Sequence, residues 1–231
     1  MTPPHTQITI VLFPNVTQLD FTGPAQVFAK MANTTVELVA ASTDPVPTDC
    51  GWSVVPTSTW NTAPPCTVLM VPGGQGAFDA MLEPATLDFV RAQAQGADWI
   101  TSVCTGSFVL GAAGLLTGKR ATSHWGSLHL LRHFGAHPIS ERVVRDTTTI
   151  TGAGVSSGID FALSLAARLH GQSAAERIQL GIEYDPQPPF STGSPDRAPA
   201  EWVKQVRDHA DANRAPMVRR AADRLRTDDH T

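Results

Sequence analysis

The chain has 231 residues, of which 42% are hydrophobic and 16% charged, so it can bury a large core and is not a disordered chain. Asp and Glu outnumber Lys and Arg by 21 to 17, giving a formal net charge of −4, which argues against nucleic acid or anionic membrane as partner. No apolar run approaches the ~18 residues of a membrane span, and no signal peptide is recognised. We therefore expect a cytoplasmic protein, built as one large domain or one domain with an appendage.

Short apolar runs alternate with helical patterns along most of the chain. The predicted strands are Ile8–Phe13, Val36–Ala41, Thr67–Val71, Trp99–Val103, Arg142–Val144 and Thr148–Thr151. The predicted helices run from Gly23 or Pro24 to Met31 and over Leu82–Ala94, Phe108–Leu116, Val155–Leu169 and Ala174–Ile182. Proline-rich Asp44–Pro65 predicts loops and a hairpin at the sheet edge. This alternation predicts an α/β fold of the doubly wound, flavodoxin-like kind, with a mostly parallel sheet between helices.

The composition changes after Asp185. Residues 186–231 begin with a proline-rich stretch and continue into a helical pattern from Glu201. We expect residues 1–185 to form the α/β domain, and 186–231 to be a segment with a C-terminal helix that packs on the domain or on a dimer partner. The pair Arg219-Arg220 is interpreted as part of a solvated helix face, because the charges of the tail nearly cancel.

One of the three cysteines lies in a pattern that indicates chemistry. Cys104 is the centre of Ser102-Val103-Cys104-Thr105-Gly106, between a predicted strand and a predicted helix. This is the spacing of a nucleophile elbow, whose tight turn requires small neighbours and exposes the sulfur. The helix that follows is expected to lower the pKa of the thiol. A buried structural cysteine is the alternative, and this is our interpretation of Cys50 and Cys66.

The remaining cysteine, histidine and glycine patterns give little support for disulfide bonds, a metal site or a dinucleotide site. Three is odd and no C-x-x-C occurs, so neither a disulfide framework nor a zinc ribbon is expected. His129 and His133 share a spacing of four, which without a third ligand is weak support for a metal. Gly73-Gly74 lacks the full dinucleotide-binding pattern. We expect no metal and no organic cofactor.

In a doubly wound sheet the site lies at the carboxyl ends of the strands. Three segments follow predicted strands in this way: Pro72-Gly73-Gly74, Cys104-Thr105-Gly106 and Thr151-Gly152-Ala153-Gly154. Glycine at such positions lets backbone approach a reacting atom, although Gly152 and Gly154 could simply permit the turn.

Two residues are candidates for proton transfer. His124 lies in Thr122-Ser123-His124-Trp125, and Asp20 lies between the apolar residues Leu19 and Phe21. Such a setting is expected to bury the Asp20 carboxyl and raise its pKa. The alternative is that Asp20 caps a helix.

These motifs together resemble the ThiJ/PfpI superfamily, which is related to class I glutamine amidotransferases, over most of residues 7–185. Within it, the segments around Asp20 and Cys104, the run Gly152–Asp160, and the tail motifs Glu183–Phe190 and Gly193–Asp196 resemble isocyanide (isonitrile) hydratases. This resemblance implies a cofactor-independent homodimer that hydrates a small isocyanide with water, giving an N-substituted formamide.

The resemblance also implies roles for individual residues. Cys104 would form a thioimidate and Asp20 would act as general acid and base, with the Thr105 side chain bonding either of them. The backbone N–H groups of Gly74 and Thr105 would occupy oxyanion-hole positions. Gly73, His124, Gly152 and Gly154 would line the site, and His124 is not required as the base.

Two departures separate this chain from other branches. The protease branch has histidine directly after its cysteine, where this chain has Thr105, and the deglycase branch has glutamate where this chain has Asp20.

Related transcription regulators carry a DNA-binding appendage of roughly 100 residues, whereas only 46 follow Asp185 here. Another cysteine enzyme, such as a glyoxalase or deglycase, and a non-catalytic small-molecule or redox-sensing domain remain as alternatives.

Overall fold

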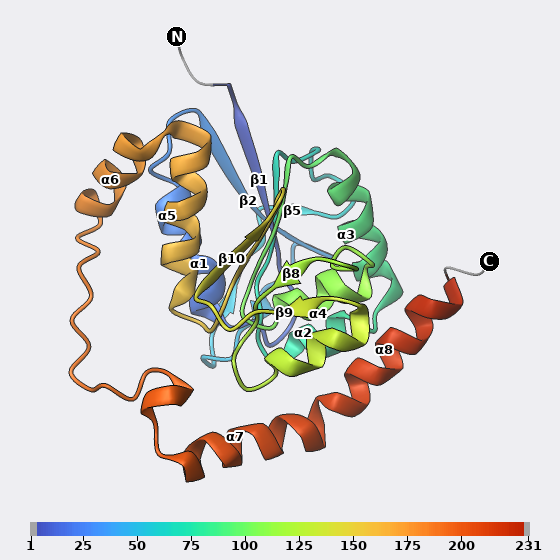
Figure 1. Cartoon of the computed structure of the whole chain (residues 1–231). Coiled ribbons are helices and arrows are strands. Elements are labelled where there is room, and N and C mark those ends of the chain that lie inside the picture. The colour runs from blue at the N-terminus through green and yellow to red at the C-terminus, as the bar shows by residue number, and fades with distance from the viewer. Residues whose placement is uncertain (1–3, 229–231) are drawn as a thin grey trace.

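The computed structural model describes residues 4–228, which form a sheet covered by helices on both faces (Figure 1). The sheet has seven strands in the order β10-β11-β7-β6-β1-β2-β5. The strands are β1 (Thr6–Val11), β2 (Thr34–Ala40), β5 (Ser58–Thr59), β6 (Val68–Val71), β7 (Trp99–Val103), β10 (Val143–Asp146) and β11 (Thr149–Gly152). All neighbours are parallel except β10 and β11, which form an antiparallel hairpin. The doubly wound, mostly parallel fold is therefore confirmed.

The central strands are buried and rich in apolar residues, because both of their faces are covered by helices. Every residue of β1 and β6 is buried, as expected for strands between two helical layers. One layer contains α1 (Gln18–Phe28) and α5 (Ser157–His170), with α6 (Gln172–Gly181) beside them (Figure 1). The other contains α2 (Gly76–Ala80), α3 (Pro84–Gly96), α4 (Gly106–Ala112) and the 3₁₀ helix η1 (Leu128–Phe134).

Helix α1 begins earlier than the sequence predicts. Pro24 was taken as its first turn, but the helix starts at Gln18, after Thr17 as N-cap, and Pro24 lies inside it. A proline at this place removes only the N–H that would bond to the carbonyl of residue 20, and the remaining turns hold the helix. The consequence is functional, because Asp20 then lies in the first helical turn, next to the carboxyl end of the sheet.

Residues 44–65 contain the predicted hairpin, formed by β3 (Val46–Pro47) and β4 (Ser53–Val54). It is a separate two-stranded sheet, and the edge of the main sheet is β5, which the sequence analysis missed because it has only two residues. A second small sheet pairs β8 (Arg120–Ala121) with β9 (His137–Pro138).

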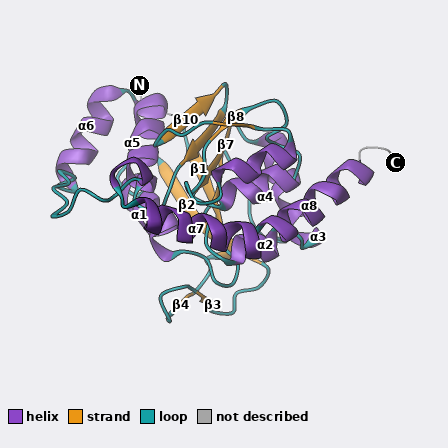
Figure 2. Ribbon diagram, turned by 60° about the horizontal axis from the view of Figure 1, so that its bottom comes forward, coloured by secondary structure: helices purple, strands orange, loops and turns teal. Residues whose placement is uncertain are grey.

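The tail contains two helices where one was expected. After the short 3₁₀ turn η2 (Pro195–Arg197) come α7 (Ala200–Asn213) and α8 (Ala215–Asp228). Figure 2 shows them crossing the α2 and α4 side of the molecule. Helix α8 packs on the domain through four buried side chains, which are Ala215, Val218, Ala221 and Ala222. Within residues 4–228 no helix is both long and apolar enough to cross a membrane.

Candidate active site

Cys104 occupies a tight turn between β7 and α4, as the elbow pattern predicts. Its φ is +56°, in the left-handed region that a non-glycine residue adopts at a cost. The Cys104 N–H lies 3.0 Å from the carbonyl oxygen of Gly152 and 2.7 Å from that of Ala153. A Cβ on Gly106 would lie 2.1 Å from the Val71 carbonyl oxygen, which is why the turn needs glycine there. The elbow is thus held against the ends of β6 and β11.

The surroundings of the sulfur differ from the prediction in two ways. Cys104 is only 5% exposed, so the thiol is buried and not displayed at the surface. Burial and the charge of Asp20 raise the pKa of Cys104 well above its ordinary value, although the Thr105 N–H and hydroxyl oppose this. The predicted lowering of the thiol pKa is therefore wrong. The short helix α4 does not outweigh the loss of water and the nearby carboxylate.

The Asp20 carboxyl lies beside the thiol and is completely buried. Its Oδ2 accepts a hydrogen bond from the Gly73 N–H at 2.8 Å, while its Oδ1 is buried and has no hydrogen-bond partner among the described residues. Burial raises the pKa of Asp20 to about 7, against the opposing effects of the Gly73 N–H and of Cys104. Thr17, not Asp20, is the N-cap of α1, so the helix-cap alternative is wrong.

The close approach of Asp20 and Cys104 couples their ionisation. A negative charge on one group disfavours a negative charge on the other. Above a pH of about 7 the pair therefore holds one proton, on the Cys104 thiol, and one negative charge, on the Asp20 carboxylate. Transfer of that proton from the thiol to the carboxylate gives a nucleophile and a proton donor at the same place.

Thr105 connects the elbow to the glycine turn after β6. Its Oγ1 accepts a hydrogen bond from the Gly74 N–H and also donates to the Gly74 carbonyl, both at 2.9 Å. The Gly74 N–H therefore already has a partner in this structure, and its expected role in an oxyanion hole stays a prediction. A Cβ on Gly73 would lie 2.4 Å from the Thr105 nitrogen and 2.8 Å from Asp20 Oδ2, so only glycine fits between them.

His124 lies near the elbow but is not bonded to it. Its Nδ1 accepts the Gly126 N–H at 3.2 Å, and its ring stacks on Trp125 with centroids 5.6 Å apart. Among the described residues no hydrogen bond joins the imidazole to Cys104 or Asp20. Burial, followed by the positive charge of Arg214, lowers the pKa of His124. The ring is thus neutral at physiological pH.

A cavity of about 500 Å³ adjoins the elbow from the side of His124. Its lining includes Ser123, His124, Ala153 and Gly154, together with the η2 turn of the tail. The Ser123 hydroxyl donates to the Cys104 carbonyl at 3.0 Å, so one wall of the cavity is bonded directly to the elbow. A Cβ on Gly154 would lie 3.1 Å from His124 Cδ2, and one on Gly152 would lie 3.2 Å from Ser157 Oγ. Both glycines allow close packing around the site.

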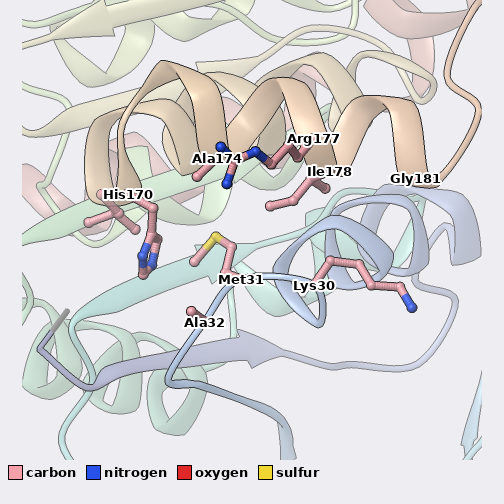
Figure 3. Close-up of a pocket in the computed structure, with 9 residues that line it drawn as sticks. Lys30, Met31, Ala32, His170, Ala174, Arg177, Ile178 and Gly181 are labelled. Atoms are coloured by element: carbon pink, nitrogen blue, oxygen red, sulfur yellow. The ribbon is translucent and has the colours of Figure 1, made fainter. Parts of the chain in front are cut away.

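A second cavity, of about 660 Å³, lies at the other end of the molecule (Figure 3). It is formed by the residues after α1, the end of α5, and α6, with His170 and Met31 on its walls. These residues lie at the amino ends of the strands, away from Cys104. In the described part of the chain no three His, Cys, Asp or Glu side chains form a possible metal cluster, and His129 pairs with Asp211 at 2.8 Å.

Comparisons with known proteins agree with this geometry. The model of the DJ-1/PfpI family matches residues 6–168. The chain belongs to the DJ-1/PfpI family. It is 48% identical over 222 residues to the isonitrile hydratase of Pseudomonas putida, covering 95% of this chain and 97% of the relative.

Two further family members define how far the likeness extends. A ThiJ/PfpI family protein from Pseudomonas syringae has 43% identity and a TM-score of 0.91, covering 96% of this chain and 92% of that one. The regulator GbdR of Pseudomonas aeruginosa, an HTH-type protein, is 30% identical over 58% of this chain but only 37% of its own length. The likeness to the hydratase and to the P. syringae protein thus includes the tail, whereas the likeness to the regulator does not extend over the whole chain.

The sequence analysis missed three contacts of the site. It did not identify the Gly73 N–H as the partner of Asp20, the bond from Ser123 to the elbow, or the position of Arg214 close to Cys104 and His124. The first two are backbone contacts, which leave little signal in a single sequence. The third depends on how the tail folds back.

Proposed function

We propose that this chain is an isonitrile hydratase, which adds water to an isocyanide R–N≡C and releases the formamide R–NH–CHO. The support from relatives is the near full-length match to the hydratase of P. putida. The observation that carries the proposal is the Asp20 carboxyl beside the Cys104 thiol, with one carboxyl oxygen that has no hydrogen-bond partner in the described chain.

The first half-reaction uses the single proton of the Cys104–Asp20 pair. The sulfur forms a bond to the terminal carbon of the isocyanide, which accepts soft nucleophiles, while Asp20 passes the proton to the same carbon. The C≡N bond becomes C=N, and the product is the thioimidate R–N=CH–S bound to Cys104. Asp20 remains as a carboxylate. A pKa of about 7 suits this step, because near that pH the Asp20 carboxylate can take the proton of the thiol and release it again to the isocyanide carbon.

The second half-reaction returns the proton. The Asp20 carboxylate takes a proton from water as the water oxygen bonds to the thioimidate carbon, and the nitrogen receives a proton through Asp20. The hydroxyl proton then passes to Asp20, the C=O bond forms and the C–S bond breaks. The Thr105 N–H, which interacts with the sulfur, stabilises the departing thiolate. The formamide leaves, and the pair again holds one proton.

The test is to incubate the purified protein with an alkyl isocyanide and measure formamide by chromatography and mass spectrometry. Turnover of more than one formamide per chain is expected. Conversion of methylglyoxal without conversion of isocyanides would instead favour a glyoxalase or deglycase. Binding without any product would favour a sensor. Either of these two results would overturn the proposal.

We also propose that the enzyme is a homodimer that works in the cytoplasm. Leu19, Trp52 and Val55 are exposed apolar side chains near α1 and the β3–β4 hairpin, and Trp202 is exposed on α7. A dimer would cover such surface. All three cysteines are free, as is usual in a reducing compartment. Sedimentation at micromolar concentration should give twice the 24.6 kDa of one chain, and a monomer would contradict the proposal.

A further inference from the structure

Arg214 lies between the two tail helices, after the end of α7 and before the start of α8. Its N–H bonds to the Ala210 carbonyl at 2.8 Å, and its carbonyl accepts from Val218 N–H at 3.0 Å. The next residue, Ala215, and Val218 are both buried against the domain. The backbone of Arg214 is therefore fixed, and its side chain is directed by the docking of α8.

The guanidinium is held without a carboxylate. Its Nη1 donates to Ser127 Oγ at 2.9 Å, and its central carbon lies 5.2 Å from the centroid of the Phe78 ring. Its Nε is buried with no hydrogen-bond partner, and no ion pair within residues 4–228 includes Arg214. A half-buried cation with an unsatisfied N–H is costly for folding alone. We therefore expect the Arg214 side chain to make a favourable interaction that offsets this cost.

Two chains of contacts lead from Arg214 to the nucleophile. The first chain passes through Phe78. The Phe78 ring lies 5.2 Å from the ring of Phe108, which belongs to α4, the helix that follows the elbow. Through Ser127, Arg214 reaches the His124 loop, because the Ser127 N–H bonds to the His124 carbonyl at 3.0 Å. At the other end of that loop, Ser123 bonds to the elbow. The loop is therefore clamped between Cys104 and Arg214.

The charges around Arg214 are few. Its positive charge interacts with Cys104 and with His124. Asp20, the other titrating group at the thiol, adds the negative charge of the pair. Asp211, on the last turns of α7, is engaged by His129 across a 2.8 Å contact. Cys104 is thus an acidic group whose negative charge interacts with the Arg214 side chain.

We propose that Arg214 is a positioning residue of the hydratase centre, whose charge stabilises the Cys104 thiolate and whose hydrogen bond to Ser127 holds the His124 loop against the elbow. This inference rests on the proposed function for its role in turnover, but its electrostatic part does not. The tail lies outside residues 6–168, which the family model matches. Arg214 is thus supplied by the tail and not by the segment that the family model matches.

The test measures the reactivity of Cys104 without any isocyanide. Iodoacetamide alkylation is followed by peptide mass spectrometry, which separates Cys104 from Cys50 and Cys66, over a range of pH. Arg214→Gln removes the charge and keeps a donor for Ser127, whereas Arg214→Lys keeps the charge. For Arg214→Gln we expect the pH midpoint to rise by about one unit and the rate at pH 7 to fall about tenfold. Arg214→Lys should stay within about threefold of the wild type.

A matched control is Arg224→Met, which removes another arginine of α8, one that bonds to the Leu82 carbonyl at 2.8 Å. It should leave the alkylation profile unchanged. If Arg214→Gln does not fold, Ser127→Ala removes the anchor and keeps every charge, and it should shift the midpoint in the same direction by a smaller amount. An unchanged profile in the folded variant, or equal losses in Arg214→Gln and Arg214→Lys, would overturn the proposal.

Turnover gives the second readout. With an alkyl isocyanide, Arg214→Gln should lower kcat about tenfold and change KM little, because Arg214 does not touch the substrate. If the wild type does not hydrate isocyanides, the proposed function fails while the alkylation result still decides the electrostatic role of Arg214. If the wild type does hydrate them and alkylation is unchanged, only the inference about Arg214 fails.

Discussion

The Gly73 N–H donates to Asp20 Oδ2 at 2.8 Å and so fixes one oxygen of a completely buried carboxyl. The other oxygen has no hydrogen-bond partner in the described chain. The carboxyl is thus oriented next to Cys104 by one hydrogen bond from the backbone. Its other oxygen is free to accept or donate a proton. In the proposed reaction this contact orients the acid, so we expect activity to depend on Gly73.

Gly73→Ala should therefore abolish activity while leaving a folded but less stable protein. The added Cβ would lie 2.4 Å from the Thr105 nitrogen and 2.8 Å from Asp20 Oδ2, so backbone and carboxyl must separate. We expect a loss of about 1–3 kcal/mol in the free energy of unfolding. Gly96→Ala is the control, because its Cβ meets nothing within 4 Å. Equal activity in the two variants would contradict the proposed positioning.

Only one of the three cysteines should be essential. Cys104→Ala should show no formamide release above background, whereas Cys50→Ala and Cys66→Ala should retain most of the activity. Cys50 is exposed in a loop, and Cys66 is buried before β6. Steady-state rates of the three variants, with circular dichroism as a check of folding, decide this. Turnover by Cys104→Ala would exclude the thioimidate.

Loss of the imidazole should slow the reaction only modestly. His124 is held neutral by burial and by Arg214, and it makes no hydrogen bond to Cys104 or Asp20 in the described chain. We expect His124→Ala to retain activity within about 10²-fold of the wild type, the lower limit of help from a general base. The formamide assay of a folded variant measures this. Inactivity as complete as that of Cys104→Ala would move the proton relay to His124.

The raised pKa of Asp20 also predicts how stability changes with pH. The folded value is about 7 against 3.8 in the unfolded chain, so between these values the folded state binds more protons. Stability is thus greatest below pH 3.8 as far as Asp20 is concerned, and decreases as pH rises towards 7. Asp20→Asn removes this loss. It should be more stable than the wild type at pH 8, by up to a few kcal/mol, and the gain should shrink towards pH 4.

Urea unfolding of the two proteins at pH 4, 6 and 8 measures this difference. A gain for Asp20→Asn that is the same at all three pH values would mean that the carboxyl does not titrate in this range. A lower stability of Asp20→Asn at pH 8 would mean that the buried carboxylate is stabilised by contacts other than the Gly73 N–H.

The sequence was sufficient to predict the fold and to select Cys104 and Asp20, which the structure places side by side, but not to predict their environment. Alternating apolar runs predicted the sheet, and the small residues around Cys104 predicted the elbow. Thr105 and Gly74 show the limit, because their mutual bonds depend on the register of β6 and β7, which a single sequence does not define. Arg214 was not singled out, because its partial burial arises only when α8 docks on the domain.

The same limit explains the error in the thiol pKa. The elbow pattern indicates a helix start behind Cys104, which favours thiolate. Burial and the neighbouring Asp20 carboxylate act in the opposite direction and are stronger. Their sizes depend on distances and solvent access that exist only in the folded chain.

The central claim is that one carboxyl carries the proton in both half-reactions, and Asp20→Asn tests it most directly. Asparagine keeps the shape and can still hydrogen-bond, but cannot give or take the proton. The measurement is formamide release from an alkyl isocyanide by folded Asp20→Asn, beside the wild type at equal concentration. We predict a loss of at least about 10⁴-fold, the upper end of general acid–base catalysis, because both steps fail together. A near-normal rate would contradict the account and leave Asp20 as a structural residue.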